Sequence, residues 1–163
     1  MGGESMKVAI IGAGASGLAL CTYLGDYPDL FDIHLYEKNA VIGKKLAATG
    51  NGHGNLSNKN ITKDRYYGLS DKLFSFVSDF HIEELAGKLK ILLRTKDELY
   101  YPYSESAKTV CDAFLDYLKQ NNISLHLETE ITDIKAKQNG YLISTNENKQ
   151  NFVDVVVLCC GGK

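Results

Sequence analysis

Residues 8 to 20 of the chain read VAIIGAGASGLAL, an apolar run that breaks into a glycine-rich turn and continues as an alanine- and leucine-rich pattern. This stretch predicts a strand, a tight turn and a helix, with the glycines spaced as G-x-G-x-x-G. Gly12 permits the turn, Gly14 lets the backbone approach a pyrophosphate, and Gly17 lets helix and strand pack closely. We therefore expect a dinucleotide-binding turn.

The helix after the turn presents its first amide groups to whatever lies over the glycines. A helix N-terminus has N–H groups without partners in the helix and carries the positive end of the helix dipole. The amides of Ala13, Ala15 and Ser16 are therefore expected to face an anion such as a phosphate.

A second strand, FDIHLYE at residues 31–37, ends in an acid that follows Gly17 by 20 residues. In dinucleotide-binding folds an acid at this spacing binds a ribose 2′-hydroxyl, so Glu37 is the candidate ribose ligand, with Lys38 beside it. An acid here disfavours NADP, because it repels the 2′-phosphate.

Length and charge limit the classes of protein. The chain has 163 residues, which fits one domain, and its formal net charge of −2 is spread over interspersed acids and bases. Neither a nucleic-acid partner nor a membrane partner is indicated, and small molecules are the expected ligands. We expect residues 1–5 to be a leader or expression remnant and residues 6–163 to form the nucleotide-binding domain, in a cytoplasmic protein.

The four cysteines form no C-x-x-C pair and no metal-ligand spacing. We expect them to be reduced, buried and structural, and no metal site is predicted. Cys159 and Cys160 are adjacent, so a disulfide between them would be strained and packing in a core strand is favoured. The histidines His34, His81 and His126 have no partner pattern.

The remaining chain predicts an inserted region and a closing strand. Residues 42–58 fit neither helical nor strand periodicity, which is typical of a functional loop. The helix at 107–118 is expected to have Ser104 as its N-cap and Glu105 in its first turn. Before that helix the sequence predicts helices at 69–80 and 82–89 and a hairpin of strands 91–95 and 98–101 that turns at Lys96-Asp97. After it the sequence predicts a strand at 123–127, an antiparallel meander of strands 131–137, 141–145 and 150–153, and a buried parallel strand at 154–160.

The order of these elements favours an α/β Rossmann-like FAD/NAD(P)-binding fold, with a central parallel sheet, helices and a small antiparallel β-meander. The flavoprotein version of the fold inserts a meander at this point, whereas a plain NAD dehydrogenase domain continues with further β-α units.

Five segments together resemble the BaiN-like (YhiN-type) bacterial FAD-dependent oxidoreductases over nearly the whole chain. They are GAGASG, the acid of YEKN, GKKLAATGNGHGNLSN, YYPYSESAKTVCDAF and VVVLCCGG. The resemblance implies an FAD cofactor, NAD(P)H as co-substrate and a small organic acceptor. Some family members reduce carbon–carbon double bonds conjugated to a ketone.

The resemblance extends the candidate cofactor site beyond the glycine turn. It implies that the glycine- and asparagine-rich loop lies against the flavin rather than being a free surface loop. The residues themselves leave three alternatives open: His53 is a flavin neighbour or a surface histidine, the closing glycines pass near the adenosine or only end the strand, and the paired lysines are pyrophosphate ligands or solvated. These residues are Thr49, Gly50, Asn51, Gly52, His53 and Asn55 of the loop, Gly161 and Gly162 at the closing strand, and Lys44 and Lys45.

The chain departs from the family pattern in two motifs and in length. His53-Gly54 stands where the family usually has Arg-Cys, and Cys159-Cys160 stands where it usually has Ala-Thr. Family members continue with a substrate-covering domain and a returning C-terminal segment, so the chain is expected to be an N-terminal portion. The alternatives are an NAD-binding dehydrogenase, a non-catalytic nucleotide-binding module and a tRNA-modifying flavoprotein; no catalytic residue and no oligomeric state are predicted.

Overall fold

The computed structural model describes residues 4–161, which divide into two compact units. The sheet unit comprises the described residues up to Leu46 and those from Phe114 onward, and the inserted unit comprises Ala47–Ala113. No helix within residues 4–161 is long and apolar enough to cross a lipid bilayer.

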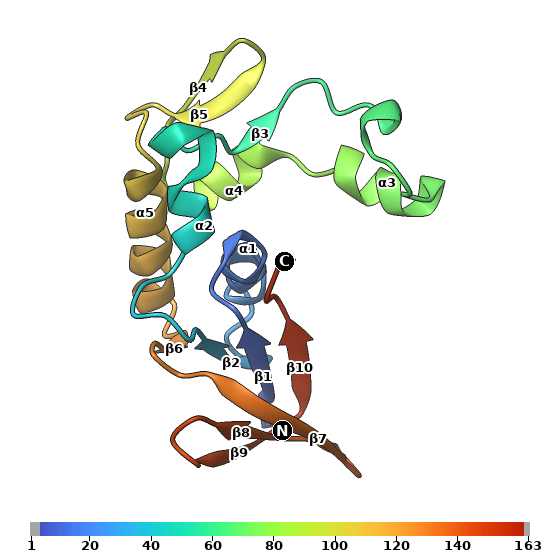
Figure 1. Cartoon of the computed structure of the whole chain (residues 1–163), viewed down its shortest axis with the longest axis vertical. Coiled ribbons are helices and arrows are strands. Elements are labelled where there is room, and N and C mark those ends of the chain that lie inside the picture. Colours follow the sequence, from blue (N-terminus) through green and yellow to red (C-terminus); the bar gives the residue numbers. More distant parts are fainter. Residues whose placement is uncertain (1–3, 162–163) are drawn as a thin grey trace. The chain divides into compact units, whose positions relative to one another are not determined.

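The sheet unit is built on four parallel strands in the order β10-β1-β2-β6 (Figure 1). The strands are β1 (Met6–Ile11), β2 (Phe31–Tyr36), β6 (Ser124–His126) and β10 (Val155–Leu158). In the centre of the sheet Ile10 lies opposite Leu35 on one side and Val157 on the other. β-Branched residues suit a pleated sheet covered on both faces, and the predicted α/β fold with a central parallel sheet is confirmed.

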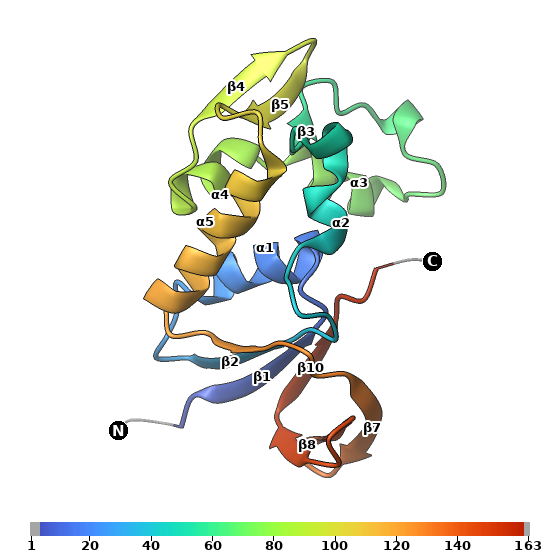
Figure 2. The same ribbon diagram turned by 60° about the vertical axis from the view of Figure 1, so that its left-hand side comes forward.

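The two faces of this sheet are covered by different structures, as Figure 2 shows. Helix α1 (Ala15–Leu24) lies over one face and buries Leu18 completely. On the other face Ala9 and Tyr36 pack with Ile143 and Val153 of the meander in one buried cluster. Successive residues of a strand point to opposite faces, so β1 and β2 contribute to both layers.

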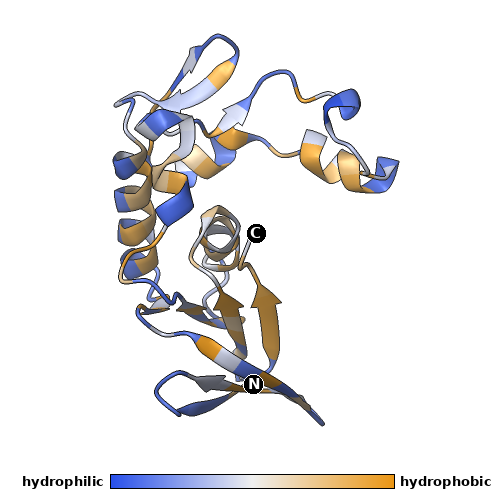
Figure 3. Cartoon of the chain, in the orientation of Figure 1, coloured by the Kyte–Doolittle hydropathy of each residue, from blue (hydrophilic) through white to orange (hydrophobic). Residues whose placement is uncertain are grey.

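The predicted meander is confirmed as an antiparallel sheet in the order β7-β8-β9. Its strands are β7 (Ile131–Lys137), β8 (Gly140–Thr145) and β9 (Gln150–Val153). β10 follows β9 almost directly, and the amide of Asp154 between them donates to the carbonyl of Lys7 over 2.9 Å. The meander therefore leads the chain into the sheet beside β1, where the colours of Figure 3 mark β1 and β10 as largely hydrophobic.

The inserted unit contains short helices and a small antiparallel sheet in the order β3-β5-β4. Helix α5 (Ala107–Gln120) begins in this unit and ends in the sheet unit. The other elements are α2 (Lys44–Ala47), which begins in the sheet unit, the 3₁₀ turns Thr49–Gly52 and Lys63–Arg65, β3 (Ser57–Asn58), α3 (Asp71–Ser78), α4 (Ile82–Lys88), β4 (Leu93–Lys96) and β5 (Leu99–Pro102).

The prediction that residues 42–58 lack regular structure is wrong in part. They contain the single turn of α2, a 3₁₀ turn and the short strand β3. Lys44 to Ala47 are good helix formers, and Leu46 is buried. β3 forms only because Ser57 pairs with Tyr100 of β5, a partner distant in the sequence.

The helix predicted from Ala107 begins there, but the predicted cap, Ser104, and first-turn acid, Glu105, are wrong. Ser104 is not the N-cap, since its hydroxyl donates to the Thr109 hydroxyl over 2.9 Å. Glu105 lies before the helix with a φ of +50° and forms an ion pair with Arg94, the closest atoms being 2.5 Å apart. The amide of Glu105 donates to the Pro102 carbonyl, so a separate turn precedes α5. The hairpin between β4 and β5 turns at Asp97-Glu98, one residue later than predicted.

The expectation that the cysteines are all buried holds for Cys21 and Cys111 only. β10 ends at Leu158, so Cys159 and Cys160 lie beyond the strand, half-buried and exposed respectively. The backbone of Cys159 lies against Gly12 of the glycine turn, outside the strand. A core position for Cys160 is therefore a wrong prediction. All four cysteines are free.

Candidate dinucleotide-binding site

The glycine turn lies at the carboxyl ends of β1 and β10. Gly12 directly follows β1, and the amide of Cys159, directly after β10, donates to the Ile11 carbonyl over 2.7 Å. The connection from β1 runs through α1 to β2, whereas β10 lies on the opposite side of β1. In an open parallel sheet such a reversal leaves a crevice outside the strand ends, and ligands bind there.

Two of the three glycines are required by close backbone contacts. Gly12 has a φ of +108°, and a Cβ on it would lie 2.5 Å from the carbonyl oxygen of Cys159. A Cβ on Gly17 would collide with the carbonyl oxygen of Gly12. The predicted roles of Gly12 in the turn and of Gly17 in helix–strand packing are therefore confirmed.

Gly14 differs because no protein atom occupies the space that its side chain would fill. A Cβ built on it meets nothing within 4 Å, and its φ of −83° is open to any residue. Gly14 is the N-cap of α1, and no side chain of the described chain caps the helix. Ala15 and Ser16, which open the helix, are exposed. The start of α1 thus presents amide donors to open space.

The carboxylate of Glu37 is held beside the glycine turn by three donors. Its Oε2 accepts a hydrogen bond from the Ala13 amide over 3.0 Å. Its Oε1 accepts from the amide of Asn39 over 2.9 Å and from the side-chain amide of the same residue. The acid predicted from spacing therefore reaches the turn, and the Ala13 amide is engaged by Glu37 rather than directed at open space.

The backbone around Glu37 is fixed by the segment that follows β6. The amide of Glu37 donates to the His126 carbonyl over 2.9 Å, and the Thr129 amide donates to the Glu37 carbonyl over 2.9 Å. The Glu128 amide donates to the Asn39 carbonyl over 3.1 Å. The end of β2 therefore continues its pairing beyond the strand, which gives the carboxylate a defined place.

The candidate lysines and the closing glycine lie close to this edge of the sheet. The Gly43 amide, just before α2, donates to the Ala13 carbonyl over 2.7 Å. Lys45 places its Nζ 3.9 Å from the position of a Cβ on Gly161, after β10. Lys38 and Lys44 are exposed. Gly162 lies outside the described residues.

In the inserted unit, the loop residues predicted to contact the flavin form a tight turn. Thr49 begins this 3₁₀ turn, and Gly50 and Asn51 inside it have left-handed φ values of +55° and +54°. Gly52 has a φ of +87° and open space around it. Gly50, Asn51 and Gly52 are exposed, and within the turn the carbonyls of Thr49 and Gly50 accept from the amides of Gly54 and His53.

His53 and Asn55 have different surroundings in the same unit. His53 is exposed, and its Nδ1 lies 3.2 Å from the Glu105 carbonyl oxygen. The side-chain oxygen of Asn55 is buried and has no hydrogen-bond partner among the described residues. A Cβ on Gly54 would lie 3.0 Å from the backbone of Ala107. Asn55 therefore offers a buried acceptor that lacks a donor.

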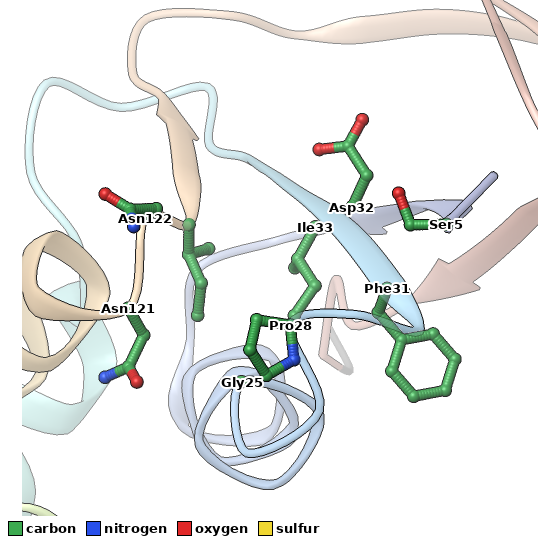
Figure 4. Close-up of a pocket in the computed structure, with 9 residues that line it drawn as sticks. Ser5, Gly25, Pro28, Phe31, Asp32, Ile33, Asn121 and Asn122 are labelled. Carbon is green, nitrogen blue, oxygen red and sulfur yellow. The ribbon is translucent and has the colours of Figure 1, made fainter. Parts of the chain in front are cut away.

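A pocket lies at the opposite, amino edge of the sheet (Figure 4). Its volume is about 290 Å³. It is lined by Ser5, Gly25, Pro28, Phe31, Asp32, Ile33, Asn121, Asn122 and Ile123. Ser5 precedes β1 and Phe31 begins β2, so this pocket is separate from the glycine turn.

Sequence reasoning missed a pair of histidines on the sheet face that the meander covers. His34 Nδ1 and His126 Nε2 are 3.0 Å apart, and His34 Nε2 is 3.2 Å from Asp32 Oδ2. The rings of Tyr36 and His126 stack at 4.5 Å between centroids. Burial lowers the pKa of His126, and His34 and Lys7 lower it further. The pairing of β2 with β6 creates this contact, so no local sequence signal could have revealed it.

Burial raises the pKa values of two side chains in the sheet unit, Cys21 and Tyr36. Burial raises the pKa of the Cys21 thiol to about 12, with the neighbouring Cys159 as a second cause. Burial, followed by Asp32, raises the pKa of Tyr36. Within residues 4–161 no group of three or more His, Cys, Asp or Glu side chains is placed to hold a metal ion.

Taken together, the donors and the acceptor match the two ends of a nucleoside diphosphate. Amide donors at the start of α1 suit the oxygens of a diphosphate, and the Glu37 carboxylate suits a hydroxyl donor.

Residues 6–163 match the family model described as HI0933-like protein Rossmann domain. The chain belongs to this family. The membership agrees with the resemblance drawn from its motifs.

A curated relative of this family member is 3-dehydro-bile acid delta(4,6)-reductase of Clostridium scindens. It is 27% identical over 165 residues, which cover 96% of this chain and 39% of the relative. The chain thus spans about two fifths of the length of that relative. The family match and this relative together support a BaiN-like FAD-dependent oxidoreductase family.

Solved structures agree with the fold. Glycine oxidase from Geobacillus kaustophilus matches with a TM-score of 0.66 and 15% identity, over 96% of this chain and 56% of that one. THI4 from Thermovibrio ammonificans matches with a TM-score of 0.62 and 15% identity, over 96% and 58%. At these identities the likeness establishes the Rossmann-like fold of the family.

Proposed function

We propose that the sheet unit binds the adenosine diphosphate half of FAD as part of a flavin-dependent oxidoreductase. One observation carries the proposal: the uncapped start of α1 adjoins the open space over Gly14, and the Glu37 carboxylate is tied to the same turn. Donors for a diphosphate and an acceptor for a ribose hydroxyl thus lie on neighbouring loops.

In this proposal the amides of Gly14, Ala15 and Ser16 bind the pyrophosphate, and the helix dipole favours its negative charge. Ala13 contributes indirectly, because its amide holds Glu37. Glu37 accepts a ribose hydroxyl. The Lys45 ammonium beside Gly161 adds positive charge at the carboxyl edge of the sheet, and Lys38 and Lys44 add to it from the surface.

For the flavin end, the proposal assigns the 3₁₀ turn Thr49–Gly52 with His53 and Asn55. The buried acceptor of Asn55 supports this assignment, because an unpaired buried polar atom costs free energy that a ligand donor removes. Flavins carry ribityl hydroxyl and ring N–H donors that suit it. Gly161 and Gly162 are assigned to the adenosine side.

FAD, when bound, supplies the redox chemistry, in which a hydride from NAD(P)H is passed to a small organic acceptor. The chain's own residues bind and orient the cofactor and neutralise its phosphates. The acceptor class is proposed from the relative in Clostridium scindens, which is named as a reductase of a 3-dehydro-bile acid. No residue of the chain is assigned as a catalytic acid or base.

The test is a titration of the isotopically labelled chain with FAD and with ADP, followed by the backbone amide signals. We expect shifts concentrated at Gly14, Ala15 and Ser16 and at Glu37. Gly14→Val should abolish these shifts without changing the far-UV circular dichroism, because its side chain fills space that no protein atom occupies. Gly87→Val on α4 is the matched control, since a Cβ there also meets nothing within 4 Å.

Two outcomes contradict the proposal. The first is a wild-type chain whose amides respond to neither FAD nor ADP. The second is a Gly14→Val variant that binds as the wild type does. A chain that responds to NADH and ADP but not to the flavin-containing ligand supports the alternative of an NAD-binding module.

A further inference from the structure

The hydrogen bonds of Glu37 are distributed unequally between its two carboxylate oxygens. Oε1 accepts two, from the amide and from the side-chain amide of Asn39. Oε2 accepts one, from the Ala13 amide. An ionised carboxylate has about two acceptor positions on each oxygen. Within the described residues, Oε1 is therefore saturated and Oε2 retains one position.

Asn39 is well placed to maintain this inequality. It follows Glu37 by two residues, and its own carbonyl accepts from the Glu128 amide, so its backbone is anchored to the segment after β6. Its side chain is half-buried, which limits the positions it can take. The Glu37 carboxylate can therefore turn Oε1 toward a ligand only by giving up the donors of Asn39.

We infer that Asn39 is a positioning residue: it orients the Glu37 carboxylate so that only Oε2 is left to bind a ribose hydroxyl, and only one hydroxyl is bound. This inference rests on the proposed function and adds how the ribose end of that site selects a hydroxyl. Without Asn39 the two oxygens of Glu37 can accept from the 2′- and 3′-hydroxyls together. With Asn39 in place the carboxylate binds one of them, and the other hydroxyl makes no bond to Glu37.

The wild-type chain tests this directly with three probes: ADP, 2′-deoxyADP and 3′-deoxyADP. Removing the hydroxyl that Glu37 binds should weaken affinity about tenfold or more, as expected for a hydrogen bond to a charged group. Removing the other should change it by less than about twofold. Equal weakening with both analogues, or with neither, overturns the inference while leaving ADP binding, and thus the proposed function, intact.

Variants then test the part played by Asn39. In Asn39→Ala the ratio of the affinities for the two deoxy analogues should move toward one, because Oε1 loses its side-chain donor. Asn39→Ser keeps a short hydroxyl donor and should restore part of the ratio, which a purely structural role would not predict. Asn139→Ala, an exposed asparagine in the turn between β7 and β8, is the control.

The Asn39 variants and the binding of the wild-type chain have three further possible outcomes. An Asn39→Ala chain that keeps the wild-type ratio shows that Asn39 does not position the carboxylate. A variant that loses its circular dichroism signal is replaced by Asn39→Ser, whose ratio then decides. Failure of the wild-type chain to bind ADP and FAD contradicts the proposed function itself.

Discussion

The amide of Ala13 donates to the carboxylate of Glu37 over 3.0 Å, and this contact joins the glycine turn after β1 to the end of β2. The two residues are 24 positions apart in the sequence. The bond makes the acid part of the turn, so a change at Glu37 acts on the geometry of the turn as well as on the ligand.

Glu37→Arg should weaken dinucleotide binding by about tenfold or more, since one charged hydrogen-bond acceptor is lost. A guanidinium has no acceptor for a ribose hydroxyl or for the Ala13 amide. Calorimetric titration with ADP measures the effect, and Glu130→Arg, at an exposed acid, is the control. An affinity equal to that of the wild type removes Glu37 from the ribose site.

Gly17→Ala should destabilise the fold by about 1–3 kcal/mol or more, because the added methyl group overpacks a filled site. The Cβ would collide with the Gly12 carbonyl oxygen and lie 3.3 Å from the Cys159 side chain. Urea unfolding measures the loss. Gly87→Ala, at an exposed helical glycine, should keep or raise stability. A Gly17→Ala chain as stable as the wild type contradicts the packing role of this glycine.

In His126→Gln the free energy of unfolding should fall less steeply than in the wild type as the pH drops below 6.5. Burial and the neighbouring His34 lower the pKa of His126 below its ordinary value of 6.5, so the unfolded chain binds its proton first as the pH falls. The contribution of neutral His126 is present above pH 6.5 and is lost as the pH falls from 6.5 through the lowered pKa of the folded state.

Urea unfolding at a series of pH values, compared with the His81→Gln control, measures this effect. The wild type and the control should lose stability over that interval, and His126→Gln should lose less. Parallel profiles for all three chains contradict the assignment.

Cys160 should be the fastest cysteine to alkylate in the native protein, and Cys21 the slowest. Cys160 is exposed, whereas Cys21 is buried and burial raises the pKa of its thiol to about 12. The thiolate is the reacting form. Brief treatment with iodoacetamide and peptide mass spectrometry gives the order, and the unfolded chain, in which all four react, is the control. Early modification of Cys21 contradicts the buried assignment.

The parts of the fold that sequence alone predicted are those with local signals. The strand, glycine turn and helix at residues 6–24 and the acid at Glu37 follow from apolar periodicity, glycine spacing and a fixed offset, all of which act within one β-α-β unit. The meander was predictable too, because its alternating strands are separated by short turns of asparagine and glycine.

The errors occur where distant partners decide the local structure. β3 exists only through its pairing with β5, and Glu105 is drawn out of the helix start, where it pairs with Arg94. The contact of His34 with His126 depends on β2 lying beside β6. In the candidate site, the residues of the turn were predictable, but the two hydrogen bonds of Asn39 to Glu37 were not, because they depend on side-chain orientation.

The position of β1 between β2 and β10 has a consequence for how the chain acquires its structure. Lys7 at the start of β1 bonds through its amide to Asp154, 147 positions later, just before β10. Contacts of such separation form slowly, because a long loop must close first. During synthesis one edge of β1 therefore stays open until almost all of these residues have left the ribosome, and the nascent chain carries an unpaired apolar edge prone to aggregation.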